Sequence, residues 1–357
     1  MLPPIWFRRL VLAPAVPVAT VLLLISLPVA LLVAAVASTR LPGRWRALRV
    51  VYFILIYLIV DSIALVWLFV LWVAAGFGRH LGREPWQARH YDLMRSYLAT
   101  IVRAGRRTFL VDFDTEMDER PGDRGSAPLL VFSRHAGPGD SFLLVHALLQ
   151  RGFRPRVVLK STLQWAPVID IALNRLPAYF VEPGAPPGTG RTAVGELAAG
   201  LGSDGALVIF PEGANYTPKR RLHSIAKLEE QGRHAEAEQA REMRHVLRPR
   251  SGGALSALEG APDADVVFVV HTGLEDFSSV ADIWRGIPMD AKVRVRGWHV
   301  PRTDVPHSPE AAETWLLRWW RQLDAWIIEH HGAAAVPESI VAAVEHTQPG
   351  GPAIETP

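Results

Sequence analysis

Two long apolar runs in the N-terminal part limit what this chain can fold into more than any other feature. The first run, from Leu10 to Thr39, has no charged residue, and the second, from Val50 to Gly78, has one, Asp61. As a helix, each run is long enough to cross the roughly 30 Å hydrocarbon core of a bilayer. We therefore predict a membrane-anchoring two-helix region over residues 1–80.

Arg8 and Arg9 precede the first run, as basic residues precede the core of a signal peptide. The run is longer than a typical signal core and a second run follows it, so we predict that both helices are retained. An acidic side chain at mid-span is costly in a bilayer. Asp61 therefore indicates either a polar partner or a shallow hairpin that returns to the same face, and we favour the hairpin.

Charge and cysteine content narrow the class of protein further. More arginines follow the second run than lie in the loop between the runs, which predicts a cell-membrane protein with its remaining chain on the cytoplasmic face. The formal net charge of +3 suits a phosphate-bearing substrate or membrane lipids. We expect no nucleic-acid partner, because no basic stripe interleaves with aromatic residues. The absence of cysteine excludes disulfides and thiolate chemistry.

From about residue 86 onward, short apolar runs alternate with helical patterns. Strands are predicted at 127–135, 154–160, 178–183, 205–213 and 264–273, with an edge strand at 290–300. Helices are predicted at 87–103, 140–152, 191–202, 223–244 and 310–330. This alternation predicts an α/β domain over 81–333, with a mostly parallel central sheet flanked by helices. The Pro-, Gly- and Ala-rich tail, 334–357, is predicted to be disordered.

The segment VFSRHAGPGDSFLL carries the most informative chemistry. A hydrophobic strand ends at His135, a Gly-Pro-Gly sequence forces a turn, and Asp140 opens a helix. The carboxylate can then return to the imidazole, orient the ring and raise its basicity, so that His135 can take a proton from a hydroxyl. The alternative is that Asp140 only caps the helix that follows.

A second segment, LVIFPEGANYTPKRR, ends another predicted strand with Pro-Glu-Gly. It places Glu212 and Gly213 at the carboxyl edge of the sheet, where open α/β sheets build their sites. With Lys219 and the two arginines that follow, these residues can receive a phosphorylated headgroup. The alternative is an acidic turn next to an ordinary basic surface.

Together the two segments resemble the glycerolipid acyltransferase family, of the lysophosphatidic acid (1-acylglycerol-3-phosphate) acyltransferase type. That family combines His-x-x-x-x-Asp with a later Phe-Pro-Glu-Gly, as here in His135…Asp140 and Phe210-Pro211-Glu212-Gly213. The segments LKSTLQWAP and HVLRPRSGG resemble the lysocardiolipin-type branch, which implies that Lys160 and Arg250 bind phosphate. The resemblance covers about residues 85 to 300.

The sequence departs from the family pattern at three places. Arg134 stands where the family often has Asn, Ala214 and Asn215 follow the Glu-Gly pair in place of Thr-Arg, and Arg191 lies further on than the family's arginine. Two arginines that bind anions in the family are thus missing from their expected positions. The acceptor headgroup, or the way its phosphate is held, is therefore open.

The resemblance implies a membrane-bound O-acyltransferase in which His135 is the general base and Asp140 its support. The acyl donor would be acyl-CoA or acyl carrier protein as a co-substrate, with no further cofactor and no metal. The acceptor would be 1-acylglycerol-3-phosphate, or alternatively another lysophospholipid or a glycolipid. A serine hydrolase is disfavoured because the Gly-x-Ser-x-Gly elbow fails after Ser141. A non-catalytic lipid-binding protein remains the alternative of a different class.

Overall fold

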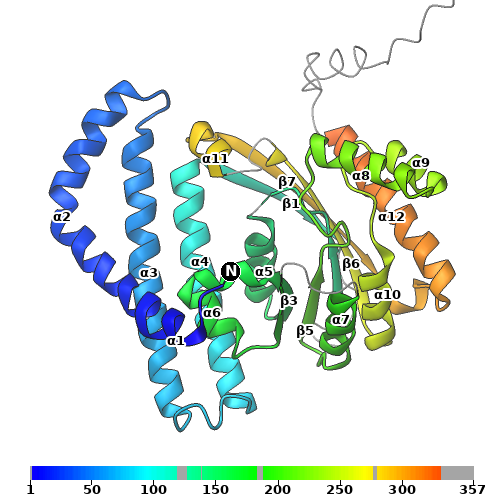
Figure 1. The fold of residues 1–357 in the computed structure, drawn as a ribbon, viewed down its shortest axis with the longest axis horizontal. Coiled ribbons are helices and arrows are strands. Elements are labelled where there is room, and N and C mark those ends of the chain that lie inside the picture. The colour runs from blue at the N-terminus through cyan, green and yellow to red at the C-terminus, as the bar shows by residue number, and fades with distance from the viewer. Residues whose placement is uncertain (1, 119–126, 138, 183–187, 276–279, 331–357) are drawn as a thin grey trace, which may run out of the picture.

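The computed structural model describes residues 2–118, 127–137, 139–182, 188–275 and 280–330. The tail predicted to be disordered lies outside the described residues. The N-terminal part forms α1 (Ile5–Phe7), η1 (Arg8–Leu12) and α2 (Ala13–Arg40) without interruption, and then α3 (Arg46–Ala74). Both long helices have the length and composition needed to cross a membrane. They form an antiparallel pair beside the α/β domain (Figure 1), and we call this pair the hairpin.

One face of α3 packs against α4 (Glu84–Phe109) and α6 (Pro167–Leu173) of the domain. Asp61 lies on this buried face, where its Oδ1 accepts a hydrogen bond from Tyr97 Oη at 2.6 Å. The acidic residue in the second apolar run therefore has a polar partner within the protein. The opposite faces of both helices expose large apolar side chains, among them Ile25, Leu32, Val66 and Phe69.

The domain is built on one seven-stranded sheet with the strand order β1-β7-β6-β2-β5-β3-β4. Its strands are β1 (Val111–Met117), β2 (Leu129–Ser133), β3 (Arg154–Lys160), β4 (Ala178–Val181), β5 (Gly205–Ile209), β6 (Asp265–Thr272) and β7 (Ala291–Val300). Neighbouring strands are parallel except for the antiparallel pair β6 and β7. The predicted α/β class with a mostly parallel sheet is confirmed.

The prediction that β7 lies at the edge of the sheet is wrong, because β7 pairs with both β6 and β1. The polar residues of β7 suggested a solvated edge. They instead face acidic residues of β1, with Lys292 Nζ 3.0 Å from Asp114 Oδ2 and Arg296 Nη1 3.6 Å from Glu116 Oε1. Strand β1, which the sequence reading missed, forms the actual edge.

The single charged helix predicted at 223–244 is also wrong, because this segment forms two helices. They are α8 (Pro218–Glu230) and α9 (His234–Glu242). Between them Gly232 adopts a φ of +70°, a left-handed conformation that ends a helix and favours glycine. The chain turns there, and the second helix packs back on the first through Ile225, Ala237 and Ala240.

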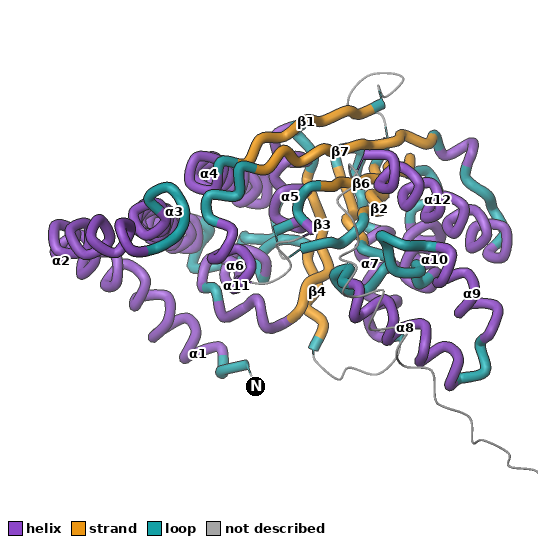
Figure 2. Tube along the Cα trace, turned by 90° about the horizontal axis from the view of Figure 1, so that it is seen from above, coloured by secondary structure: helices purple, strands orange, loops and turns teal. Residues whose placement is uncertain are grey.

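Helices cover both faces of the sheet, so that the domain has three layers (Figures 1 and 2). On one face lie α7 (Thr189–Ala199), α10 (Ser251–Gly260) and α12 (Pro309–His330), and on the other α5 (Asp140–Gln150) with α4 beyond it. The remaining short elements are η2 (Ser161–Trp165), α11 (Val280–Gly286) and η4 (Arg302–Asp304). Trp315 and Trp320 of α12 pack on Phe268 of β6 in the core of the domain.

Strand β2 lies in the middle of the sheet, and its five residues are all buried. Successive side chains point to opposite faces: Leu130 and Phe132 pack toward α10 and α12, whereas Leu129 and Val131 pack toward α5. The parallel neighbours β5 and β6 flank β2 and end at the same edge of the sheet. The segments that follow these three strands are therefore brought together there.

Candidate active site

Residues 135–137 and 139–140, which we call the catalytic turn, lie between β2 and α5 and wrap around one carboxylate. Asp140 is buried, and its Oδ2 accepts hydrogen bonds from the backbone N–H groups of Ala136 at 2.6 Å and Gly137 at 2.7 Å. The Nδ1 atom of His135 lies 3.2 Å from the same oxygen. The carboxylate thus bonds to the residues before α5 rather than capping that helix. The His–Asp pair expected from the sequence is present in the fold.

The ring of His135 is held on one side and open on the other. Its backbone N–H donates to Glu212 Oε1 at 3.1 Å, and its carbonyl oxygen accepts from the N–H of Tyr216 at 2.6 Å. The imidazole packs on the ring of Phe210, with centroids 4.5 Å apart. The side chain is 18% exposed, and no described residue forms a hydrogen bond to Nε2. That nitrogen is available to a substrate hydroxyl.

The environment of Asp140 keeps it ionised. Burial alone would raise its pKa. Electrostatic attraction to His271, hydrogen bonds from His135 and His271, and the Gly137 N–H outweigh burial and hold the pKa of Asp140 below its usual range. A charged carboxylate at Nδ1 fixes the tautomer of His135 that leaves Nε2 free to accept a proton.

Glu212, predicted to bind substrate, lies underneath the catalytic turn and is buried. Its Oε1 accepts from His135 N–H, and its Oε2 accepts from Leu247 N–H at 3.0 Å. Burial raises the pKa of Glu212 to about 8, despite the opposing effects of the Leu247 amide, Arg134 and the His135 amide. In this conformation Glu212 supports the turn, and its contact with substrate stays a prediction. The next residue, Gly213, has a φ of +69° and needs glycine.

The predicted phosphate-binding residues are brought together only in part. Arg250 lies against Gly213, and its backbone N–H donates to Pro211 O at 2.9 Å. Arg191, displaced from the family position in the sequence, packs against Gly252 in the first turn of α10. Lys160 and Lys219 are exposed at the end of β3 and the start of α8. Among the described contacts, neither lysine touches Arg250.

Comparison with known proteins identifies the domain. Residues 114–270 match the family model of the acyltransferase domain, and this segment includes both motifs. These residues of the chain therefore carry an acyltransferase domain. The chain is similar to the crystal structure of the 1-acyl-sn-glycerophosphate (LPA) acyltransferase, PlsC, from Thermotoga maritima, with 16% identity and a TM-score of 0.48 over 80% of this chain and 99% of that one. A comparison with curated proteins found no match.

In the sequence, Arg134 of the acyltransferase domain stands out only as a departure from the family pattern. The structure buries it completely. Its guanidinium donates to Glu275 Oε1 at 2.6 Å, to the His271 carbonyl at 2.5 Å and to the His245 carbonyl at 3.0 Å. Although burial raises the pKa of Glu275, the charge and hydrogen bond of Arg134 lower it to about 2. This arginine ties the end of β2 to the end of β6, and it is not available to bind an anion.

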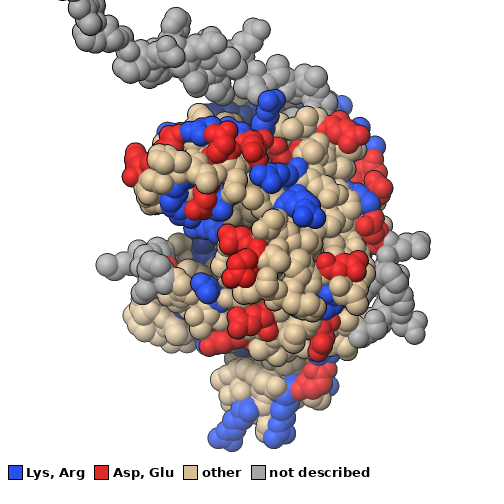
Figure 3. Space-filling model, turned by 90° about the vertical axis from the view of Figure 1, so that its right-hand side faces the viewer, with Lys and Arg blue, Asp and Glu red and all other residues tan. Residues whose placement is uncertain are grey.

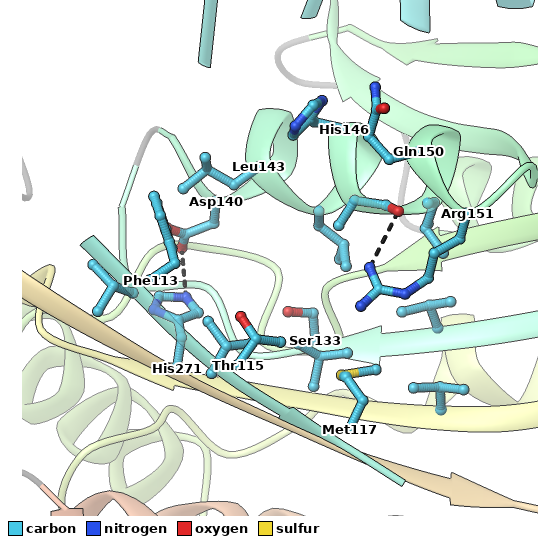
Figure 4. A pocket seen from close by; sticks show the side chains of 18 of the residues that line it. Phe113, Thr115, Met117, Ser133, Asp140, Leu143, His146, Gln150, Arg151 and His271 are labelled. Carbon is cyan, nitrogen blue, oxygen red and sulfur yellow. Dashed lines mark hydrogen bonds and ion pairs between the residues drawn. The ribbon is translucent and has the colours of Figure 1, made fainter. Parts of the chain in front are cut away.

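His271 and the cavity beside it were not predicted from the sequence. A cavity of ≈ 350 Å³ lies between α5 and the strands β1, β2, β6 and β7 of the acyltransferase domain, with a mostly apolar lining. Figure 4 shows Asp140 and His271 at one end and Met117 and Arg151 at the other. A lone histidine in the apolar run VVFVVHT was the only sequence signal for this site.

Proposed function

We propose that this acyltransferase transfers a fatty acyl group from acyl-CoA or acyl carrier protein to the free hydroxyl of a lysophospholipid. The preferred acceptor in this proposal is 1-acylglycerol-3-phosphate, and the product is phosphatidic acid. The observation that carries the proposal is the pairing of His135 Nδ1 with the buried carboxylate of Asp140, which leaves Nε2 open. Another lysophospholipid or a glycolipid is the alternative acceptor.

The chemistry requires no covalent enzyme intermediate. His135 Nε2 takes the proton of the acceptor hydroxyl while the hydroxyl oxygen attacks the carbonyl carbon of the thioester. Asp140 stabilises the imidazolium that forms at His135. When the tetrahedral intermediate collapses, the C–S bond breaks, and the thiolate leaves and takes the proton from His135. The ester product and the free thiol then account for all atoms.

The acceptor phosphate, in this proposal, binds near the first turn of α10. Backbone N–H groups at a helix N-terminus favour an anion, and α10 begins at Ser251. Arg250 directly precedes the helix, and Arg191 packs on its first turn. These two arginines would take the place of those missing from the family positions. Lys160 and Lys219 stay candidates for contacts with a larger headgroup or with the acyl donor.

We also propose that the hairpin lies in one leaflet, with the domain on the cytoplasmic face. Both ends of the hairpin contact the domain. Arg8 Nη1 lies 3.1 Å from Asp170 Oδ1 at one end, and Arg46 donates to the Ile287 carbonyl at 3.0 Å at the other. A helix pair that crossed the bilayer could not keep both contacts on one side. The exposed faces of the hairpin are apolar, whereas the face of the domain opposite the hairpin, over α8, α9 and α12, carries intermixed acidic and basic side chains (Figure 3).

The absence of cysteine makes this topology directly testable. Pro42→Cys lies in the exposed turn between α2 and α3, and Lys227→Cys lies on the exposed surface of α8. We expect a membrane-impermeant maleimide to label both variants in inside-out vesicles and neither in right-side-out vesicles. Labelling of Pro42→Cys only in right-side-out vesicles would show that the hairpin spans the bilayer.

The reaction is tested with labelled acyl-CoA, acyl carrier protein thioester and a panel of lysolipids in detergent or liposomes. We expect phosphatidic acid from lysophosphatidic acid, and a loss of about 10²- to 10⁴-fold in His135→Ala, the usual contribution of a general base. His223→Ala, at an exposed histidine on α8, is the matched control and should keep full activity.

The other outcomes of this assay separate the alternatives. Transfer to a different acceptor would keep the role of His135 and change the substrate. Equal activity in His135→Ala and the wild type would remove that role. No transfer with any acceptor or donor would favour a lipid-binding protein.

A further inference from the structure

His271 is a second histidine on the carboxylate of Asp140. It lies near the end of β6, a strand whose residues are otherwise almost all apolar, and it is 7% exposed. Its Nε2 lies 3.3 Å from Asp140 Oδ2, the same oxygen that faces His135 Nδ1. Figure 4 shows the side chains of His271 and Asp140 pointing toward one another at the end of the apolar cavity.

We infer that His271 is a positioning residue that shares the Oδ2 atom of Asp140 with His135 and thereby limits how strongly Asp140 supports the catalytic base. The inference rests on the proposed role of His135. Among the described contacts His271 Nε2 meets Asp140 and not His135, so we expect it to act on the reaction through Asp140.

The surroundings of His271 determine which of its nitrogens carries the proton. Both ring nitrogens are buried without a hydrogen bond of full geometry among the described residues, but Nε2 lies 3.3 Å from Asp140 Oδ2, whereas Nδ1 has no polar partner. A buried N–H group without an acceptor is costly, whereas a bare ring nitrogen costs less. The proton of the neutral ring therefore lies on Nε2, where it points at the Asp140 carboxylate. In this tautomer His271 is a hydrogen-bond donor to Asp140.

Other charged and titratable groups around this pair are few and mostly engaged. Arg134, next to the His271 carbonyl, is paired with Glu275 at 2.6 Å. Glu212 is committed to two backbone amides below the turn. The other titratable groups that line the cavity, on α5 and α4, are His146, Arg151 and Arg106. Asp140 is thus the one carboxylate in direct contact with His271 in the described part of the chain.

The direction of the effect follows from the shared oxygen. A donor from His271 draws negative charge away from the Oδ2 that stabilises the imidazolium of His135. The protonated form of His135 is then less favoured, and the free base persists to lower pH. A positive charge on His271 would act in the same direction by repulsion. Removing His271 should therefore make His135 protonate at a higher pH.

The test compares the pH dependence of kcat/KM in the wild type, His271→Phe and His271→Gln. The phenylalanine ring keeps the volume of the side chain but has no donor, whereas the Gln amide has one. We expect the acidic limb of His271→Phe to move up by about 1 pH unit, a typical effect of one neighbouring donor or charge. His271→Gln should keep its midpoint close to that of the wild type.

An unchanged midpoint in His271→Phe, or an equal shift in His271→Gln, would overturn the inference. If His271→Phe folds but is too slow to assay, the pH dependence of His135 carbethoxylation by diethyl pyrocarbonate measures the same midpoint. His135→Ala is assayed in parallel. If His135→Ala keeps its activity, the proposed function is refuted. If His135→Ala loses its activity but His271→Phe leaves the pH midpoint unchanged, only the role of His271 is refuted.

Discussion

Two buried aspartates hold two different regions of this acyltransferase together. Asp140 lies in the catalytic turn, and its backbone donors are residues three and four positions earlier in the chain. Asp170 lies in α6, under the start of the hairpin, and its ion-pair partner Arg8 is near the N-terminus. Gln164 and Asn174 donate to Asp170 Oδ1 from nearby, both at 3.1 Å.

The difference shows that contacts within one turn and contacts between distant segments have different roles in this molecule. The donors of Asp140 are fixed by the turn itself, so the carboxylate and the turn order one another and place His135. Asp170 gains its charged partner only when the N-terminal helix docks on α6. A buried ion pair that joins distant segments is weak evidence for stability, but it fixes how they are arranged. We expect Asp140 to govern chemistry and Asp170 to govern the placement of the hairpin.

The largest expected effect is that of Asp140→Asn. An Asn side chain has nearly the same shape and can still accept from the Ala136 and Gly137 amides, but it has no charge for His135. We expect kcat/KM to fall by about 10²- to 10⁴-fold, the range for loss of acid–base support. The unfolding temperature, measured by thermal denaturation in detergent, should change much less. If the variant keeps most of its activity, the charge of Asp140 is not needed for the reaction. The difference drawn here between the roles of Asp140 and Asp170 would then be wrong.

A smaller effect, on docking rather than chemistry, is expected from Arg8→Met. The change removes the buried partner of Asp170 and should weaken the contact of η1 with α6 by about 3–5 kcal/mol, as when one member of a buried pair is lost. Hydrogen–deuterium exchange should show faster exchange in residues 5–12 and in α6, while the catalytic turn stays protected.

The smallest expected effect belongs to the matched control, Arg9→Gln. Arg9 Nε also lies near Asp170, at 3.6 Å from Oδ2, but its side chain is 43% exposed. Solvent screens such a pair, so its loss should weaken docking by less than about 1 kcal/mol. Equal effects of the two arginine changes would mean that charge alone, and not the buried position of Arg8, holds the hairpin.

Much of the fold was predictable because it depends on patterns of near neighbours. Strands β2, β3 and β6 and helices α5 and α12 lie within a few residues of the predicted ranges, since apolar periodicity follows directly from burial. The error at β7 occurs where a distant segment changes the meaning of a local pattern, whereas the break in the helix predicted at 223–244 is local, at Gly232. The charged side of β7 suggested solvent until β1 supplied acidic partners for Lys292 and Arg296.

In the candidate site, too, contacts between near neighbours in the chain were predictable and contacts between distant segments were not. The pairing of His135 with Asp140 was predicted because five positions and a Gly-Pro-Gly turn allow few other geometries. The burial of Glu212 under the turn was not, because it depends on amides contributed by His135 and Leu247 from two other segments. Arg134 stood out in the sequence only as a departure from the family pattern, and its burial against Glu275 assigns it a structural position.

By itself, the sequence determined the apolar hairpin, the α/β class and the catalytic turn, because each depends on side chains close together in the chain. Only the tertiary structure decided what surrounds them. It brought His271 from β6 to the carboxylate of Asp140, and it brought Arg8 from the N-terminus to Asp170. The physical reason is that a buried charge is stabilised by whichever donors the fold brings within about 3–4 Å, and sequence distance does not restrict which ones those are.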